Sequence, residues 1–141
     1  MNYLYYNKSY VDCYNLAFDY YNSINSNSQK LLLLDLLIKA NLKLLNHEDI
    51  DIDKINNKTT SVIRELDNHI SNPQLILNIS IYFKQLKAVN DSIKYIIKAF
   101  HTYALPNISL INQLNELLHT HNEDIDNVTY EDLYKIKSEL I

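Results

Sequence analysis

The sequence predicts an all-α protein of about seven antiparallel helices, and three observations point to this fold class. Apolar residues recur at the i, i+3, i+4 and i+7 spacing of an amphipathic helix along almost the whole chain. Sustained alternation of apolar and polar residues, which is typical of strands, is rare and has its main short stretch at 50–53. The chain contains no glycine, a residue on which tight hairpin turns and β-rich folds depend.

The helical spacing divides the 141 residues into seven segments, which we expect to form a single all-helical domain over 1–141. The predicted helices cover residues 9–25, 29–46, 53–70, 73–86, 90–104, 109–121 and 130–140, and a short helix at 2–7 is a further candidate. Short polar links separate these segments, and such links place consecutive helices side by side in antiparallel directions.

Each of the first three segments has one apolar stripe, which we expect to face the core. The stripe of segment 9–25 consists of Cys13, Leu16, Ala17, Tyr20 and Ile24. The stripe of segment 29–46 consists of Leu33, Leu37, Ala40 and Leu44. The stripe of segment 53–70 consists of Ile55, Thr59, Val62, Leu66 and Ile70.

The four later segments follow the same rule. Their core-facing residues are Ile76, Ile79, Phe83 and Leu86 in the first, Ile93, Ile97, Phe100 and Ala104 in the second, Leu110, Leu114, Leu117 and Leu118 in the third, and Leu133, Ile136 and Leu140 in the last. All of these steps have helical spacing.

The ends of the segments carry helix signals. Ser9 and Asp12 have the spacing of a capping box, and Asn72 before Pro73 predicts an N-cap followed by proline at the first helical position. Because glycine is missing, we expect asparagine to take the left-handed conformation that often closes a helix, at Asn25, Asn46 and Asn122.

Segments 73–86 and 90–104 share a recognisable spacing, in which Ile76, Ile79, Ser80 and Phe83 are followed by Ser92, Ile96 and Ala99. Over residues 73–106 this resembles a tetratricopeptide repeat, whose pattern is W-x2-L-G-x2-Y…A-x3-F…P. The small residues Ser80 and Ser92 would let the two helices cross closely. Isoleucine replaces the tryptophan of the pattern, serine replaces its glycine and alanine, and Pro106 lies two residues late.

The resemblance implies helical hairpins stacked in a superhelix that binds peptides or partner helices on a concave face, without cofactors. A compact helix bundle is the alternative architecture, since its core stripes would look the same. The chain is also similar in its helix number to viral Bcl-2-like proteins, which would bind a partner helix in a groove and modulate host apoptosis or signalling. The Asn-Trp-Gly-Arg groove motif of those proteins has no counterpart here, because the chain has neither tryptophan nor glycine.

Composition excludes many chemistries. Phosphate-binding loops, dinucleotide-binding fingerprints and nucleophile elbows all need glycine, so we expect no enzyme and no cofactor. A net charge of −4 without a basic patch argues against nucleic acid as a partner. The longest apolar run, 31–38, is too short to span a membrane, and no secretory signal is recognisable, so we expect a cytoplasmic protein without membrane insertion. The dominance of Asn, Ile, Leu, Tyr and Lys indicates an AT-rich genome.

Two acidic or histidine-rich stretches are weak metal candidates. Asp49, Asp51 and Asp53 open like a calcium loop but lack its glycine, and His119 and His121 have no third ligand at a recognisable spacing. We therefore expect no metal site. The single Cys13 lies in an apolar stripe, which predicts a buried, inert thiol rather than a nucleophile.

Tyrosine is concentrated at the start of the chain, where seven of the 12 tyrosines fall in the first 21 residues. Segment 9–25 therefore has a second apolar face, and that face needs a neighbour, which is either the short N-terminal segment or a protein partner. Tyrosine is enriched at interfaces because it combines a large apolar area with a polar tip. The predicted partner-facing anchors of a protein complex or of self-association are Tyr5, Tyr6, Tyr10, Tyr14, Phe18 and Tyr21.

Overall fold

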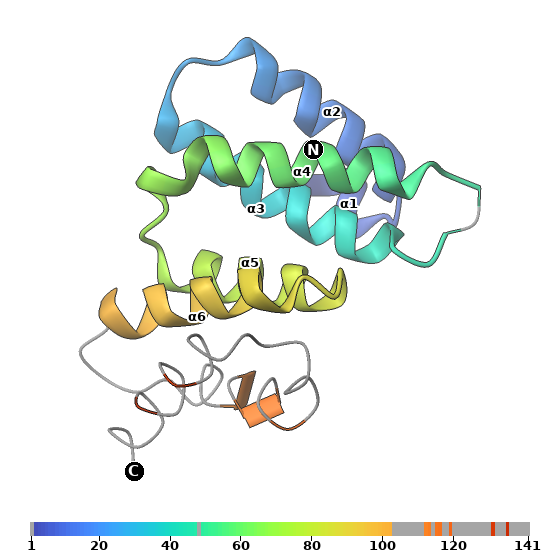
Figure 1. The fold of residues 1–141 in the computed structure, drawn as a ribbon. Coiled ribbons are helices and arrows are strands. Elements are labelled where there is room, and N and C mark those ends of the chain that lie inside the picture. Colours follow the sequence, from blue (N-terminus) through green and yellow to red (C-terminus); the bar gives the residue numbers. More distant parts are fainter. Residues whose placement is uncertain are drawn as a thin grey trace. The chain divides into compact units, whose positions relative to one another are not determined.

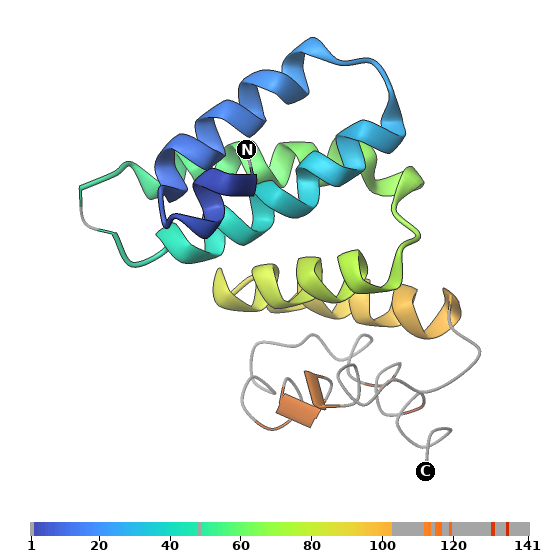
Figure 2. The ribbon, with the colours of Figure 1, turned by 180° about the vertical axis from the view of Figure 1, so that it is seen from behind.

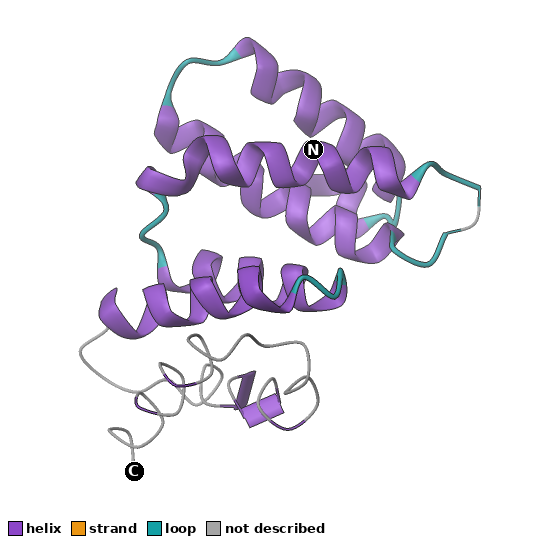
Figure 3. Ribbon diagram, viewed as in Figure 1, coloured by secondary structure: helices purple, strands orange, loops and turns teal. Residues whose placement is uncertain are grey.

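The structure is a computed structural model that describes residues 2–47 and 49–102, together with isolated positions further on (Asn112, Gln113, Asn115, Glu116, His119, Glu131 and Lys135). Every regular element in this described part is a helix, so the all-α prediction is confirmed (Figure 3). The chain divides into two compact units, Met1–Ile70 and Ser71–Ile141. That residues 1–141 form a single domain stays a prediction.

The first unit contains four α-helices, α1 (Asn2–Tyr6), α2 (Tyr10–Ser23), α3 (Asn27–Leu44) and α4 (Ile52–Leu66), and ends in a short 3₁₀ turn, η1 (Asp67–His69). Each of these helices contacts the next one along the chain. Helix α4 lies nearest the viewer in Figure 1 and α1 lies nearest in Figure 2, so the two helices flank the α2/α3 pair from opposite sides.

The second unit contains the antiparallel hairpin of α5 (Pro73–Gln85) and α6 (Val89–Thr102). The predicted proximity of Ser80 and Ser92 is confirmed, because both are fully buried and each hydroxyl bonds the other helix. Ser92 Oγ donates to the Ser80 carbonyl at 2.7 Å, and the two hydroxyl oxygens are 2.9 Å apart. Larger side chains at these positions would push the two helix backbones apart.

Most of the predicted helices are found in the described residues. Five of the seven are present with ends shifted by a few residues, and the short candidate at 2–7 is α1. Segment 53–70 leaves the α-helical form after Leu66, where the chain tightens into η1. The segments 109–121 and 130–140 lie outside the described residues, apart from isolated positions, so their helices stay a prediction.

Three helix N-termini have side-chain caps. Asn72 Oδ1 accepts from the Leu75 N–H at 3.1 Å, with Pro73 in the first turn, as predicted. Asp51 caps α4, and Ser26 caps α3. The capping box predicted at Ser9 is wrong, because the Ser9 side chain makes no cap bond; its backbone already belongs to the turn that closes α1.

The left-handed residues are lysines and not asparagines. Among the described residues, only Lys8 (φ 63°) and Lys87 (φ 62°) have positive φ. The prediction for Asn25 and Asn46 is therefore wrong, because α2 runs into an extended Ile24 and α3 continues helically into Leu45. Asn122 lies outside the described residues.

The turns α1–α2 and α5–α6 have the same hydrogen-bond pattern. Ser9 N donates to the Leu4 carbonyl and Lys8 N to the Tyr5 carbonyl, at 2.8 and 3.0 Å. At the second turn Ala88 N donates to Phe83 and Lys87 N to Lys84, at 2.9 and 3.0 Å. Both are Schellman motifs, and each leaves three residues between its helices. The two hairpins therefore turn with one local geometry.

The core stripe of α2 differs from the predicted one. Its fully or largely buried residues are Cys13, Tyr14, Ala17 and Tyr21, whereas Leu16 and Tyr20 are exposed. Helix α3, in contrast, has buried residues on most of its circumference, including all four predicted ones (Leu33, Leu37, Ala40 and Leu44). A helix that is apolar nearly all round is one that neighbours cover from several sides.

Candidate partner-binding surface

The six predicted anchors separate into two groups along the first unit. Tyr5, Tyr6 and Tyr10 gather at the α1–α2 turn, where the Tyr5 ring meets the other two edge-on at centroid distances of 5.8 and 5.4 Å. Tyr14, Phe18 and Tyr21 follow one side of α2, with nearly parallel neighbouring rings 6.3 Å apart. Of the six side chains, only that of Tyr6 is mostly exposed.

Tyr14 is not a partner-facing residue, which corrects the sequence-based prediction. Its side chain has no exposed surface, and its hydroxyl lies 2.7 Å from Thr59 Oγ1 and 3.1 Å from the Ile55 carbonyl of α4. Thr59 Oγ1 is also 2.6 Å from Asn41 Oδ1, which can only accept. Thr59 has one hydroxyl proton. When that proton is donated to Asn41, the Tyr14 hydroxyl is the donor in its 2.7 Å contact with Thr59.

This buried polar chain joins three helices. The Asn41 amide nitrogen donates onward to Asn56 Oδ1 at 2.8 Å, so α2, α3 and α4 are connected through Tyr14, Asn41 and Thr59. Burial raises the pKa of Tyr14 to about 12, which keeps its hydroxyl protonated and able to donate at neutral pH. The network holds the helices in register and exposes none of these three polar groups to a ligand.

Tyr21 is likewise an internal residue, and its predicted partner-facing role is corrected. It is 5% exposed, and its hydroxyl donates to Glu65 Oε2 on α4 at 2.6 Å. Lys30 of α3 lies 3.5 Å from the other Glu65 oxygen and 5.1 Å from the Tyr21 ring centroid. Burial, followed by the hydrogen bond to Glu65, raises the pKa of Tyr21, and the Tyr21 hydroxyl lowers the pKa of Glu65. The second apolar face of α2 thus packs on α4.

Phe18 occupies an intermediate position between these two tyrosines. Its ring is half-buried, and the Lys58 ammonium group of α4 lies 4.7 Å from its centroid. Tyr5 and Tyr10 are also half-buried. Only part of each of these three rings is therefore exposed.

The surface instead presents a different set of large apolar side chains, which we call the exposed apolar set. Its members are Tyr3 (63% exposed), Tyr6 (80%), Leu16 (45%), Tyr20 (48%) and Leu32 (75%). All five belong to α1, α2 and α3, and no large apolar side chain that the structure describes beyond residue 32 is exposed. Of the predicted anchors, only Tyr6 belongs to it. Three of the five are tyrosines of the first 21 residues, but helical spacing alone did not show which rings are exposed.

The other sequence candidates have structural explanations. Cys13 is buried without a disulfide, as predicted, and burial raises the pKa of its thiol, so the reactive thiolate is disfavoured. Asp51 is occupied as the N-cap of α4. Within the described residues no three side chains of His, Cys, Asp or Glu converge on a possible metal position. His121 and the acidic residues after it lie outside the described residues.

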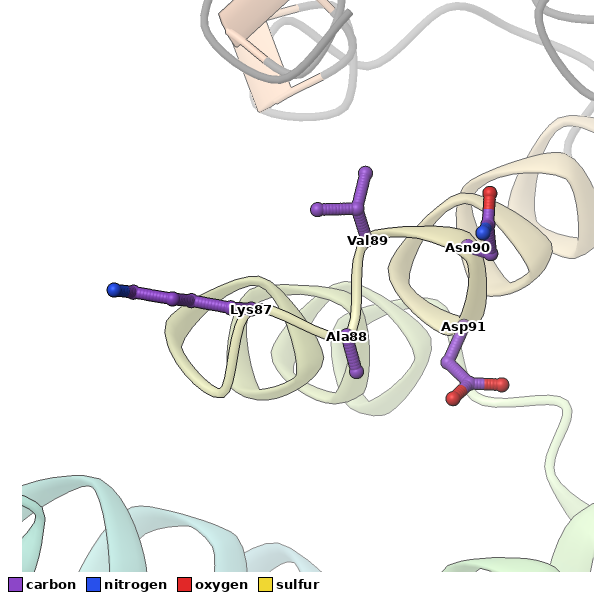
Figure 4. Close-up of a pocket in the computed structure, with 5 residues that line it drawn as sticks. All are labelled: Lys87, Ala88, Val89, Asn90 and Asp91. Atoms are coloured by element: carbon purple, nitrogen blue, oxygen red, sulfur yellow. The ribbon is translucent and has the colours of Figure 1, made fainter. Parts of the chain in front are cut away.

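A shallow hollow of about 390 Å³ lies at the α5–α6 turn and is lined by residues 87–91 (Figure 4). The side chains of Lys87, Ala88 and Val89 point in different directions, and Asn90 and Asp91 lie on opposite sides of the chain. Ligand sites bring a few polar groups together over an apolar floor. This arrangement has no such convergence and gives no catalytic constellation.

In the part of the chain that the structure describes, no helix is both long and apolar enough to cross a membrane. Comparison with known proteins gave no matching family model, no similar curated protein and no similar solved structure.

Proposed function

We propose that this chain is a non-catalytic protein–protein interaction or scaffold subunit built from helical hairpins. The observation that carries the proposal is the exposed apolar set: five large apolar side chains on three adjacent helices in contact with water. Exposed apolar residues that occur singly are ordinary, whereas a contiguous exposed apolar patch is typical of a binding surface. All five of these residues lie within the first 32 positions of the chain. Three of the five are tyrosines, which are favoured at interfaces.

The tetratricopeptide-like arrangement is part of the same proposal. Two features support it: the close Ser80–Ser92 crossing and the Schellman turn shared by the α1–α2 and α5–α6 hairpins. Arrays of helical hairpins commonly act by presenting a surface to other proteins.

The proposal also holds that the chain is not an enzyme and lies in the cytoplasm. The chemistry of its buried side chains supports this part. The buried hydroxyl of Tyr14 and the thiol of Cys13 are held protonated, so neither is poised as a nucleophile. A buried cysteine without a disulfide is usual for proteins of a reducing compartment. A net charge of −4 favours a protein over nucleic acid as the partner, and the proposal includes no cofactor.

Affinity purification tests the proposal. The tagged full chain is expressed in its native cells, and co-purified proteins are quantified by mass spectrometry for the wild type and for Tyr6→Asp/Tyr20→Asp. We expect the double variant to lose a defined set of proteins by about tenfold or more, because a charge in an apolar contact costs roughly 2 kcal/mol or more. Asn57→Asp/Ser61→Asp is the matched control, since it adds the same charge at exposed positions of α4.

Circular dichroism must show equal helix content in all three proteins. Retention of every co-purified protein by the folded double variant would contradict the proposed surface.

A further inference from the structure

The outer face of α2 combines two apolar side chains with two carboxylates. Leu16 and Tyr20 are four residues apart and therefore neighbours on the helix surface. Asp12 lies one turn before Leu16, and Asp19 lies three residues after it, so both carboxylates border the same ridge. All four side chains are exposed.

Among the side chains that the structure describes, neither carboxylate has a positive partner. Neither Asp12 nor Asp19 forms an ion pair or hydrogen bond with any described side chain, whereas Asp35 pairs with Lys39 and Glu65 pairs with Lys30. Helix α2 itself contains no lysine or arginine. The Tyr20 hydroxyl likewise makes no hydrogen bond within the described residues.

From this face we infer that the partner segment is a basic amphipathic helix, with lysine or arginine flanking an apolar stripe, that docks along α2 over Leu16 and Tyr20. The inference rests on the proposed function and specifies its partner. Unpaired carboxylates repel nucleic acid and anionic membranes, so the charge of the face selects a cationic protein segment. The ridge formed by Leu16 and Tyr20 matches the groove between the side-chain rows of a second helix.

A pair of designed peptides tests the inference. Both have about 18 residues, which is long enough for an isolated helix, and carry the same leucine stripe; one has lysine and the other glutamate beside it. Binding to the full-length chain is measured by fluorescence anisotropy of the labelled peptides. We expect the lysine peptide to bind about tenfold more tightly, since two exposed ion pairs contribute roughly this factor.

The decisive measurement is a charge exchange. Asp12→Lys/Asp19→Lys should reverse the preference, so that the glutamate peptide binds the variant more tightly than the lysine peptide does. The control is Asp49→Lys/Asp53→Lys, which makes the same change in net charge at exposed residues and, like Asp12, alters the first turn of a helix. The control should keep the wild-type preference.

Three outcomes would overturn the inference: neither peptide binds, the preference does not respond to the charge exchange, or analytical ultracentrifugation shows that the face pairs with a second copy of the chain. None of these outcomes depends on the co-purification result. If Tyr6→Asp/Tyr20→Asp still loses the native complex, only the basic-helix inference fails and the proposed function stands.

Discussion

The fold changes the acid–base chemistry of Tyr14. Its pKa of about 12 compares with about 10 for an exposed tyrosine, so at high pH the unfolded chain releases a proton that the folded chain retains. The stabilisation is therefore complete below pH 10 and is lost as pH rises from 10 to 12. We expect this group to lower the free energy of unfolding by about 1 kcal/mol between pH 9 and pH 11, measured by urea denaturation.

Tyr14→Phe is the control for this prediction. The variant keeps a ring beside Phe18 but has no ionisable group, so its stability should fall less steeply with pH over the same range. At neutral pH it should be less stable by about 1–2 kcal/mol, because Thr59 loses a hydrogen-bond partner in a buried place. Identical slopes in the two proteins would show that the proton is not bound at Tyr14.

The burial of Tyr14 also marks the limit of sequence reasoning at the scale of single residues. Tyrosine can serve as a core residue or as a surface residue, and helical spacing places Tyr14 and Tyr20 on two adjacent faces of α2. The side chains of α4 decide between them, since Thr59 and Glu65 supply acceptors for the two buried hydroxyls. These contacts join residues more than 40 positions apart, which no local pattern encodes.

At the scale of elements, the left-handed lysine of the α5–α6 turn leads to a second prediction, which concerns the free energy of unfolding. A lysine in the left-handed conformation costs about 1–2 kcal/mol relative to a right-handed one, and glycine does not carry this cost. Lys87→Gly should therefore raise the free energy of unfolding by about 0.5–1 kcal/mol, after the greater entropy of glycine in the unfolded chain is subtracted. Equilibrium urea denaturation of the full chain measures the change.

Two substitutions separate this effect from the loss of the lysine side chain. Lys87→Ala keeps a Cβ atom and its steric conflict, so its stability should stay close to that of the wild type. Lys43→Gly places glycine inside the last turn of α3 and should lower stability by up to about 1 kcal/mol. A Lys87→Gly protein no more stable than Lys87→Ala would contradict the backbone explanation.

Most elements of the described part could be predicted because their signals are local. Apolar spacing identified the helices, and the Asn72–Pro73 pair identified the start of α5. The helix ends were harder to predict, because two helices are closed by a lysine with positive φ, a conformation that a residue with a Cβ atom disfavours. There the hydrogen bonds of the Schellman turn and the packing of the hairpin override the preference of the residue.

At the scale of the whole molecule, composition indicated a tyrosine-rich N-terminal region, but helical spacing did not show which of its rings are exposed. The tyrosine surplus singled out α1 and α2, yet five of the six predicted anchors are buried or half-buried. The exposed positions Leu16 and Tyr20 were assigned to the core, since a helix with apolar residues on two faces does not reveal which face its neighbours cover. Long-range packing is the missing information.

The division of the chain into units gives the last prediction. The hydrogen bonds of Tyr14 and Tyr21 join α2 to α4, and those of Asn41 join α3 to α4, inside the unit Met1–Ile70. A fragment of residues 1–70 should therefore fold by itself into a helical monomer with cooperative urea unfolding, although a core of this size gives only about 3–5 kcal/mol. Circular dichroism and sedimentation measure helix content and mass.

A specific variant distinguishes native folding of the fragment from helix formation without packing. In the folded fragment, Tyr14→Asp would bury a carboxylate in place of a neutral hydroxyl and should abolish cooperative unfolding, since an unpaired buried charge costs several kcal/mol. Tyr20→Asp places the same charge at an exposed position and should leave the transition nearly unchanged. If both fragments, or neither, lost the transition, the buried network would not be what organises this unit.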